Sequence, residues 1–201
     1  MARSTEGADQ RRINTEIRST SELDSTWKKT PGKWGHSLHS LAPYVGGFPP
    51  ALAHYFIERY TEPDDTVLDP MCGGGTAPLE AALRGRKGWG NDRFEYAYTL
   101  TRAKCNPLED ATFRACFDAK RFAAESVPND NNPLLGNDDL RVFYSDYTLD
   151  KLLRLRNVLR DDNSIEAAYI KAIICGILHG PSDMYLSLQT KDTYSGSVNY
   201  V

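Results

Sequence analysis

Apolar side chains in the first half of the chain either recur at helical spacing or form short buried runs. Leu52, Phe56 and Tyr60 repeat at helical spacing behind a Pro-Pro pair, which is tolerated in the first turn of a helix. The predicted elements are, in order, a helix, a strand, a helix, a strand and a helix, over residues 49–60, 66–68, 77–83, 88–91 and 94–104. Strands joined to helices by short turns are typical of a parallel sheet covered by helices, so the sequence predicts an α/β fold.

The pattern becomes helical in the second half of the chain. The expected elements are three helices and one acidic, Asn-rich loop, over residues 108–122, 149–159, 165–178 and 128–137. The first residues of the chain are polar and rich in Ser, Thr, Arg and Glu, which is typical of a loosely ordered segment. We therefore divide the chain into an N-terminal arm, an α/β part and a helical insertion, at residues 1–30, 31–107 and 108–201.

Composition places the chain among soluble globular proteins. Hydrophobic residues make up 40% of its 201 residues and charged residues 25%, both ordinary values. The formal net charge of −3 does not indicate a nucleic-acid-binding protein, although such binding requires only a local basic face. No apolar run approaches the ~20 residues that span a bilayer, and the N-terminus has no apolar signal core, so we expect no membrane partner.

The cysteines and histidines do not indicate a metal site. The four cysteines form no C-x-x-C pair, and His36 and His39 lack the second ligand pair of a zinc site. We therefore expect no bound metal. Isolated cysteines of this kind are typical of reduced thiols, which favours a cytoplasmic location.

The most informative run extends from Val67 to Thr76, where a buried strand ends at Asp69 and a glycine turn leads into a helix. Glycine lets the backbone approach a ligand without an intervening Cβ. The free N–H groups at the start of the helix favour a carboxylate or phosphate. We expect Thr76 to be the N-cap of this helix, which places Pro78 in its first turn.

Three kinds of ligand compete for such a turn. A P-loop requires Gly-Lys-Ser/Thr, and no lysine follows Gly75, whereas a dinucleotide-binding turn has glycine where Pro78 stands. The remaining ligand carries an amino acid at one end and a ribose at the other. Asp69 is placed to pair with its amine, and Asp92, roughly 20 residues on at the end of the next strand, to accept from its ribose hydroxyls. S-adenosyl-L-methionine carries these groups in this order. A purely structural interpretation, with the acids as caps and the glycines as a tight turn, stays open.

The same run resembles a known family. Asp69–Thr76, D-P-M-C-G-G-G-T, is similar to the D-P-F-x-G-[SG]-G-T cofactor motif of amino-methylating DNA methyltransferases, which modify cytosine N4 or adenine N6. Gly85–Asp92 resembles their G-R-x-x-x-G-x-D second strand. Gly47–Leu52 resembles the F-P-x-x-L segment that closes over the methionine end of the cofactor, and Tyr98–Lys104 resembles the helix that follows. The resemblance is specific over residues 34–107.

The resemblance implies a site-specific DNA methyltransferase with a Rossmann-like fold, S-adenosyl-L-methionine as cofactor and double-stranded DNA as partner. The cofactor-binding residues that it implies are Phe48, Asp69, Pro70, Met71, Cys72, Gly73, Gly75, Thr76, Asp92 and Arg93. A restriction endonuclease is a further expected partner where such an enzyme belongs to a restriction–modification system.

The chain departs from this family in its catalytic motif. The family's [DSN]-P-P-[YFW] holds the target amino group and stacks on a flipped-out base, and it does not occur in the 201 residues. Phe48–Ala51 has the two prolines without the flanking groups. Two predicted strands also fall short of the seven-stranded sheet of this fold. We therefore expect an incomplete methyltransferase fold with no catalytic residue of its own, inactive as an isolated chain, from the N-terminal part of a longer enzyme or a truncated gene product.

Two alternatives stay open. RNA guanine-N2 methyltransferases have the motif D-P-M-C-G-S-G-T followed by I-E-A-A, which matches Met71, Cys72 and Leu79–Ala82 even better. The lack of a recognisable N-terminal RNA-binding module, the Phe48 segment and the helix at 101–104 favour DNA. The second alternative is a non-catalytic nucleic-acid adaptor that has kept a relic cofactor fold and presents a basic patch.

Overall fold

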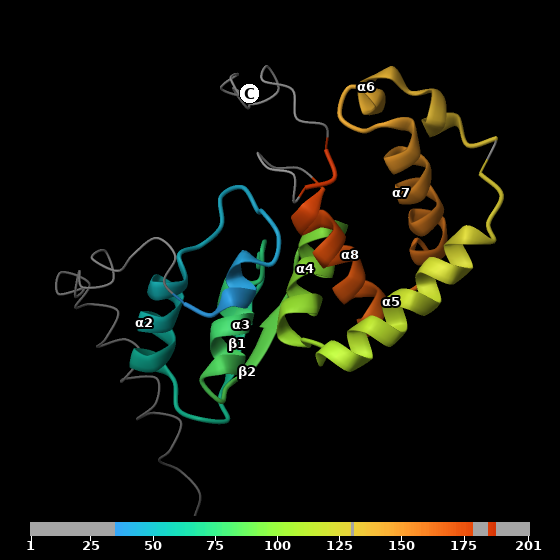
Figure 1. Ribbon diagram of the computed structural model, residues 1–201. Helices are drawn as coiled ribbons and strands as arrows, with labels where there is room; N and C mark the ends of the chain where they lie inside the picture. Colours follow the sequence, from blue (N-terminus) through green and yellow to red (C-terminus); the bar gives the residue numbers. More distant parts are fainter. Residues whose placement is uncertain (1–34, 130, 179–184, 188–201) are drawn as a thin grey trace, which may run out of the picture. The chain divides into compact units, whose positions relative to one another are not determined.

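The computed structural model describes residues 35–129, 131–178 and 185–187, all of which belong to one compact unit, Gly35–Val201 (Figure 1). The expected N-terminal arm lies outside the described residues. The first elements are η3 (Ser37–Ser40), α2 (Pro50–Tyr60), β1 (Thr66–Asp69), α3 (Thr76–Leu83), β2 (Lys87–Gly90) and α4 (Glu95–Cys105). Each helix and strand expected between residues 49 and 104 is thereby confirmed.

The two strands form a parallel pair whose register runs from Thr66 opposite Lys87 to Asp69 opposite Gly90. Helix α3 connects the strands and covers one face of the pair. A Cβ added to Gly88 would lie 2.2 Å from the carbonyl oxygen of Pro78, so the strand and the helix are in close backbone contact there.

The opposite face of the strand pair is open. Leu68 and Trp89 are cross-strand partners, and they are 62% and 63% exposed. Parallel sheets are ordinarily covered on both faces. These two strands are the sheet of the described residues, so the expected fold class is confirmed in part: the α/β unit is compatible with part of a Rossmann-like fold.

The second half of the described chain is helical, as expected. Its elements are α5 (Asp110–Glu125), η4 (Pro133–Gly136), α6 (Asp138–Arg141), α7 (Asp146–Leu159) and α8 (Ile165–Ile177). Ser145 and Ser164 cap α7 and α8 through hydrogen bonds from backbone amides to their hydroxyls. The Asn-rich loop contains a short 3-10 turn, because the Asn132 side chain accepts from the Leu134 amide.

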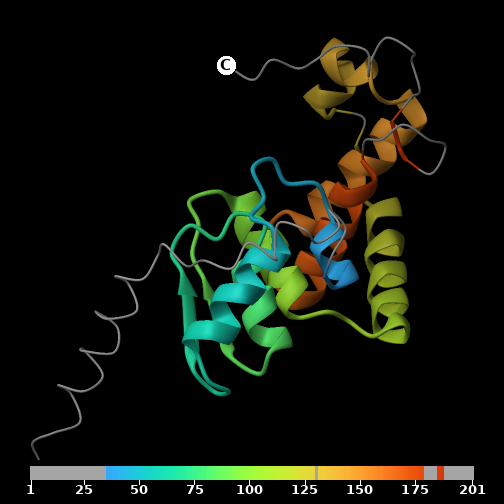
Figure 2. The same ribbon diagram turned by 90° about the vertical axis from the view of Figure 1, so that its left-hand side faces the viewer.

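Helix α8 packs against α4 and also against α5 (Figure 2). One core cluster joins Leu100 and Ala103 of α4 to Ala172 of α8, and a second joins Leu159 of α7 to Ala167 and Ile170 of α8. The α/β elements and the later helices therefore share a core through α8. Among the described residues, none of the helices is long and apolar enough to cross a membrane.

The close contact at Gly88 makes a prediction about stability. Gly88→Ala should lower the free energy of unfolding by about 1–3 kcal/mol, because the new methyl group overlaps the backbone of Pro78 and the strand must move away from α3. Gly136→Ala is the control, since a Cβ there meets nothing within 4 Å. Urea unfolding followed by circular dichroism measures both variants, and an unchanged midpoint for Gly88→Ala would contradict this packing.

Candidate functional site

The turn between β1 and α3 depends on glycine at two positions. Gly73 and Gly75 have φ values of +48° and +76°, in the left-handed region that favours glycine. Gly75 is the N-cap of α3, and Thr76 is the first residue of the helix. The expectation that Thr76 is the N-cap was therefore wrong by one position, because the left-handed Gly75 ends the turn and a β-branched residue is disfavoured in that conformation.

Asp92 connects this turn to the segment that follows β2. Its Oδ2 accepts the amide of Gly73 at 2.8 Å, and its Oδ1 accepts the amide of Phe94 at 2.9 Å. The hydrogen bond from the Phe94 amide, followed in size by the one from the Gly73 amide, lowers the pKa of the Asp92 carboxyl. Asp92 lies two residues beyond the end of β2 rather than in the strand, and it is ionised where it binds the turn.

Asp69 is the last residue of β1, and its Oδ1 accepts the amide of Met71 at 3.1 Å. Both acids lie near the buried thiol of Cys72: burial is the main cause that raises the pKa of this thiol, and the charges of Asp69 and Asp92 raise it further. The backbone joins the same segments, since Asn91 donates to the Asp69 carbonyl and accepts from Cys72, each at 2.9 Å. The structure therefore brings the two acids to one edge of the sheet.

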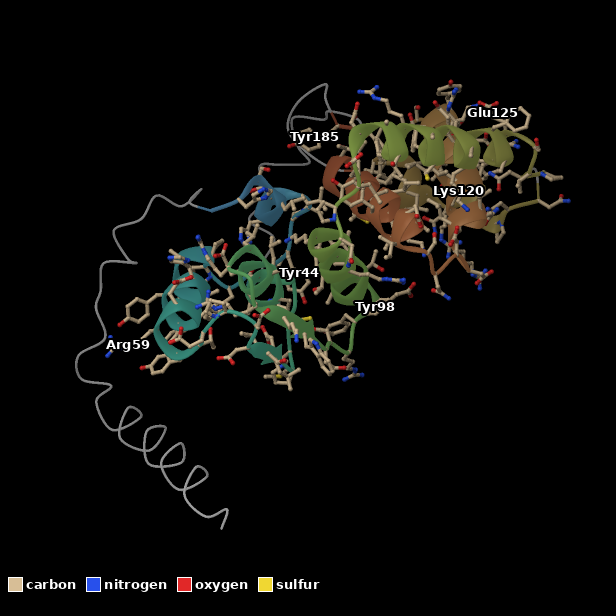
Figure 3. All side chains as sticks on the ribbon, turned by 90° about the horizontal axis from the view of Figure 1, so that it is seen from below. Tyr44, Arg59, Tyr98, Lys120, Glu125 and Tyr185 are labelled. Carbon is tan, nitrogen blue, oxygen red and sulfur yellow. The ribbon has the colours of Figure 1, made fainter. Side chains whose placement is uncertain are left out.

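An aromatic side chain that the sequence did not assign to the site covers the turn. A Cβ on Gly73 would lie 2.9 Å from Cε1 of Tyr44, and one on Gly74 would lie 3.1 Å from the Tyr44 Cβ. Tyr44 is labelled in Figure 3. Tyr44 stacks on Tyr96 with 5.9 Å between ring centroids, and the Tyr96 hydroxyl donates to the Pro43 carbonyl at 2.6 Å. The segment upstream of α2 is thus fixed on the turn through Tyr44. The available signal was an aromatic residue inside a Gly- and Pro-punctuated segment.

The other predicted residues differ in exposure. The residues exposed to solvent are Phe48, Pro70, Met71 and Arg93. The half-buried ones are Asp69, Gly73 and Asp92, and the buried ones are Cys72, Gly75 and Thr76. The hydrogen bonds tie Met71 to Asp69 and Gly73 to Asp92, so four of the predicted residues are brought together at the turn. The cofactor contacts of all these residues stay predictions.

The side of the turn that faces α4 is held by two α4 side chains. The Thr101 hydroxyl donates to the Gly73 carbonyl at 3.3 Å, and the Lys104 ammonium donates to the Gly74 carbonyl at 2.7 Å. A Cβ on Gly75 would lie 2.7 Å from the Thr101 Oγ1, so α4 approaches the turn as closely as Tyr44 does. Burial lowers the pKa of Lys104 to about 8.

A buried carboxylate lies on the inner face of α3. Glu80 is 1% exposed, and its Oε1 is 2.7 Å from Nε2 of His39. His54 Nδ1 and Arg84 Nε lie 3.7 and 3.9 Å from its second oxygen. This cluster joins η3, α2 and α3 behind the glycine turn. Within residues 35–129, 131–178 and 185–187, no group of three or more Cys, His, Asp and Glu side chains has the arrangement of a metal site.

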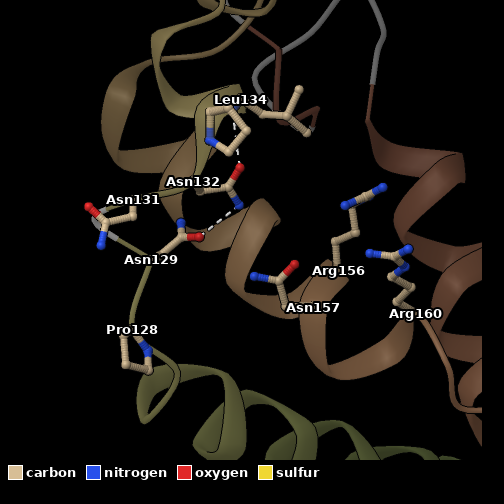
Figure 4. Close-up of a pocket in the computed structure, with 9 residues that line it drawn as sticks. Pro128, Asn129, Asn131, Asn132, Leu134, Arg156, Asn157 and Arg160 are labelled. Atoms are coloured by element: carbon tan, nitrogen blue, oxygen red, sulfur yellow. Dashed lines mark hydrogen bonds between the residues drawn. The ribbon is translucent and has the colours of Figure 1, made fainter.

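A separate polar cavity lies in the helical part (Figure 4). It has a volume of about 480 Å³ and is lined by the end of α7, including Arg156, Asn157 and Arg160, and by the Asn-rich loop. Two of the loop asparagines have structural partners: the Asn132 amide donates to the Asn129 side chain at 2.9 Å, and the Asn129 amide donates to the Asp150 carboxylate of α7 at 2.9 Å. None of the lining residues belongs to the glycine turn, so this cavity is not the site predicted from the sequence.

Comparison with known proteins points to one family. A family described as DNA methylase, of the N6/N4 type, matches residues 3–103, just over half of the chain. A type II methyltransferase of Methanocaldococcus jannaschii, M.MjaII, is 34% identical over 55 residues, which are 27% of this chain and 10% of that protein. The match therefore spans about a tenth of the length of this curated relative. No solved structure shows a significant match.

The contacts of Asp92 predict how stability depends on pH. Because its pKa is lowered in the folded chain, Asp92 contributes stability above about pH 4, and this contribution is lost as the pH falls through the lowered pKa. Asp92→Asn should therefore be less stable than the wild type at neutral pH, with a difference that shrinks on acidification. Asp161→Asn is the control, since that side chain is 94% exposed. Urea unfolding between pH 7 and pH 3 makes the comparison, and a constant difference would contradict the role of Asp92 as an anionic acceptor.

Proposed function

The chain belongs to the N6/N4 DNA methylase family, and we propose on that premise that its glycine turn binds S-adenosyl-L-methionine for methyl transfer to an exocyclic amino group of a DNA base, cytosine N4 or adenine N6. The observation that carries the proposal is the pair of carboxylates, Asp69 and Asp92, which accept the amides of Met71 and Gly73 where the chain leaves β1 and enters the glycine turn. A cytoplasmic location and a restriction endonuclease partner are predictions that rest on the family resemblance alone.

The functional groups of the cofactor fit the residues around the turn. The amides of Gly74, Thr76 and Ala77 have no hydrogen-bond acceptor among the described residues, and a carboxylate at the start of α3 would satisfy them. Asp69 is the acceptor for an ammonium. Asp92 uses each oxygen once, and a carboxylate has further lone pairs for the hydroxyls of a ribose.

The protein's part in the reaction is alignment. When bound, the cofactor supplies a methyl group on a sulfonium, which is a good leaving group, so the donor and the acceptor must mainly be held in line. In this chain, Asp69, the glycine turn and Tyr44 orient the donor's amino acid end, and Asp92 orients its ribose. The exposed Phe48 belongs to the segment that the family resemblance assigns to the methionine end.

We place the acceptor-side groups outside these 201 residues, because [DSN]-P-P-[YFW] is absent from them. The open face of the strand pair supports this arrangement. Leu68 and Trp89 present an apolar surface of the kind that further α/β elements cover. The isolated chain is therefore proposed to bind the cofactor weakly and not to methylate. DNA rather than RNA is proposed as the substrate, because the matching family consists of DNA methylases.

Cofactor binding tests the first half of the proposal. Isothermal titration calorimetry of the wild-type chain with S-adenosylhomocysteine should give binding, and Asp69→Asn should weaken it about 10-fold or more, since a hydrogen bond to a charged group contributes about 1.5–3 kcal/mol. Asp118→Asn, an exposed change on α5, is the control and should bind like the wild type. Absence of binding by the folded wild-type chain would contradict the cofactor assignment.

Methyl transfer tests the second half. The isolated chain, with radiolabelled S-adenosylmethionine, should transfer no methyl group to duplex DNA or to transfer RNA. Detectable incorporation into either would show that the acceptor groups lie within this chain. Filter binding with both nucleic acids separates the two substrate classes, and retention of transfer RNA alone would favour the RNA guanine-N2 alternative.

A further inference from the structure

Lys104 is a cation in a place where cations are rarely found. It lies on the buried face of α4 and is 2% exposed. Its ammonium donates to two backbone carbonyls, that of Gly74 at 2.7 Å and that of His39 at 3.2 Å. In the described part of the chain, no carboxylate lies within ion-pair distance of it. A buried ammonium without a counter-ion is costly, so the contacts that it makes must account for its presence.

Packing alone does not require a lysine at this position. An aliphatic side chain of similar length fills the same space without the cost of desolvating a charge, and the neighbouring core positions Leu100 and Ala103 are apolar. What an aliphatic residue cannot supply is a donor that reaches two carbonyls of different segments. The role of Lys104 is therefore to connect these two segments through their carbonyls.

One of these segments is the glycine turn. Thr101 and Lys104 hold the carbonyls of Gly73 and Gly74, so α4 fixes two successive peptide planes. In a trans peptide the carbonyl and the following amide point in opposite directions. Drawing the Gly73 carbonyl toward α4 consequently turns the Gly74 amide away from α4, which is the orientation that a ligand at the turn requires.

The other segment is the one that covers the turn. His39 belongs to η3, directly upstream of Tyr44, and its imidazole contacts Glu80 of α3 at 2.7 Å while its carbonyl accepts from Lys104. Tyr44 in turn packs on Gly73 and Gly74. Lys104 thus connects the turn and its aromatic cover through a single buried group.

We propose that Lys104 is a positioning residue of the donor site: its ammonium fixes the Gly74 carbonyl and the His39 carbonyl, and so holds the glycine turn and the Tyr44 segment in the arrangement that receives the cofactor. The inference rests on the proposed function for the identity of the ligand. The geometric claim, that one ammonium sets the turn and its cover, is independent of that identity. Burial lowers the pKa of Lys104 to about 8, as expected for an ammonium with no carboxylate within ion-pair distance among the described residues.

The test uses Lys104→Met, which keeps an unbranched side chain, shorter by one atom, and removes the donor. The matched control is Lys171→Met, because Lys171 also donates to a backbone carbonyl, that of Asp162 at 3.2 Å, away from the turn. The readouts are the urea midpoint, the ¹³C carbonyl shift of Gly74 and calorimetry with S-adenosylhomocysteine. We expect Lys104→Met to keep a cooperative unfolding transition, to shift the Gly74 carbonyl resonance and to bind at least about 10-fold more weakly, whereas Lys171→Met changes neither the resonance nor the affinity.

Thr101→Val is the second variant, in case Lys104→Met fails to fold. It is nearly isosteric, removes the other tether of the turn, and should move the Gly73 carbonyl resonance and weaken binding in the same direction. An unchanged Gly74 resonance in folded Lys104→Met, or unchanged affinity in a variant whose resonance has moved, overturns the positioning role. Absence of binding by the wild type would instead refute the proposed function, and the carbonyl shifts would still decide whether Lys104 holds the turn.

Discussion

The hydrogen bond from the Gly73 amide to the Asp92 carboxylate connects the segments that leave the two strands, and the rest of the site depends on it. The turn after β1 has weak conformational preferences of its own, because its glycines adopt left-handed φ values without steric cost. Neighbouring side chains therefore set its shape. Asp92 holds an amide on one side, and Thr101 and Lys104 hold carbonyls on the other. Opposed tethers of this kind convert a flexible sequence into a surface with fixed donors and acceptors.

The same contacts give a structural reason for the glycines of the turn. The space that side chains at 73 and 74 would occupy is filled by Tyr44, and the space at 75 is filled by Thr101. The glycines are thus required by packing within the chain, whatever ligand the turn receives. A glycine run alone is for this reason weak evidence for a cofactor. The stronger evidence is the pair of acids, Asp69 and Asp92, that accept the amides of Met71 and Gly73, together with the family to which the chain belongs.

The sequence predicted the elements well because their signals are local. The helical spacing of Leu52, Phe56 and Tyr60 and the apolar run of β1 depend only on neighbours in the chain. The tertiary contacts that shape the site join residues between 19 and 65 positions apart, and no periodicity marks them. Lys104 in particular resembles a solvated cation at the end of a helix until the fold shows that Gly74 and His39 surround it. The N-cap at Gly75 was missed for a related reason. Threonine is a common N-cap residue, and only the left-handed backbone conformation of Gly75 shows that the cap lies one position before Thr76.

The structural and the ligand-binding interpretations of Asp92 are compatible. As a structural group, it accepts the amides of Gly73 and Phe94, which fixes the turn and the start of the following segment and keeps the carboxylate ionised. As a ligand-binding group, it needs to be ionised, immobile and close to the turn, and these are the properties that the structural contacts produce. The two amides occupy one acceptor site on each oxygen, so each oxygen retains a lone pair at the half-buried edge of the sheet. The tether that orders the turn therefore also presents a fixed acceptor for the ribose of the proposed cofactor, and one residue suffices for both tasks.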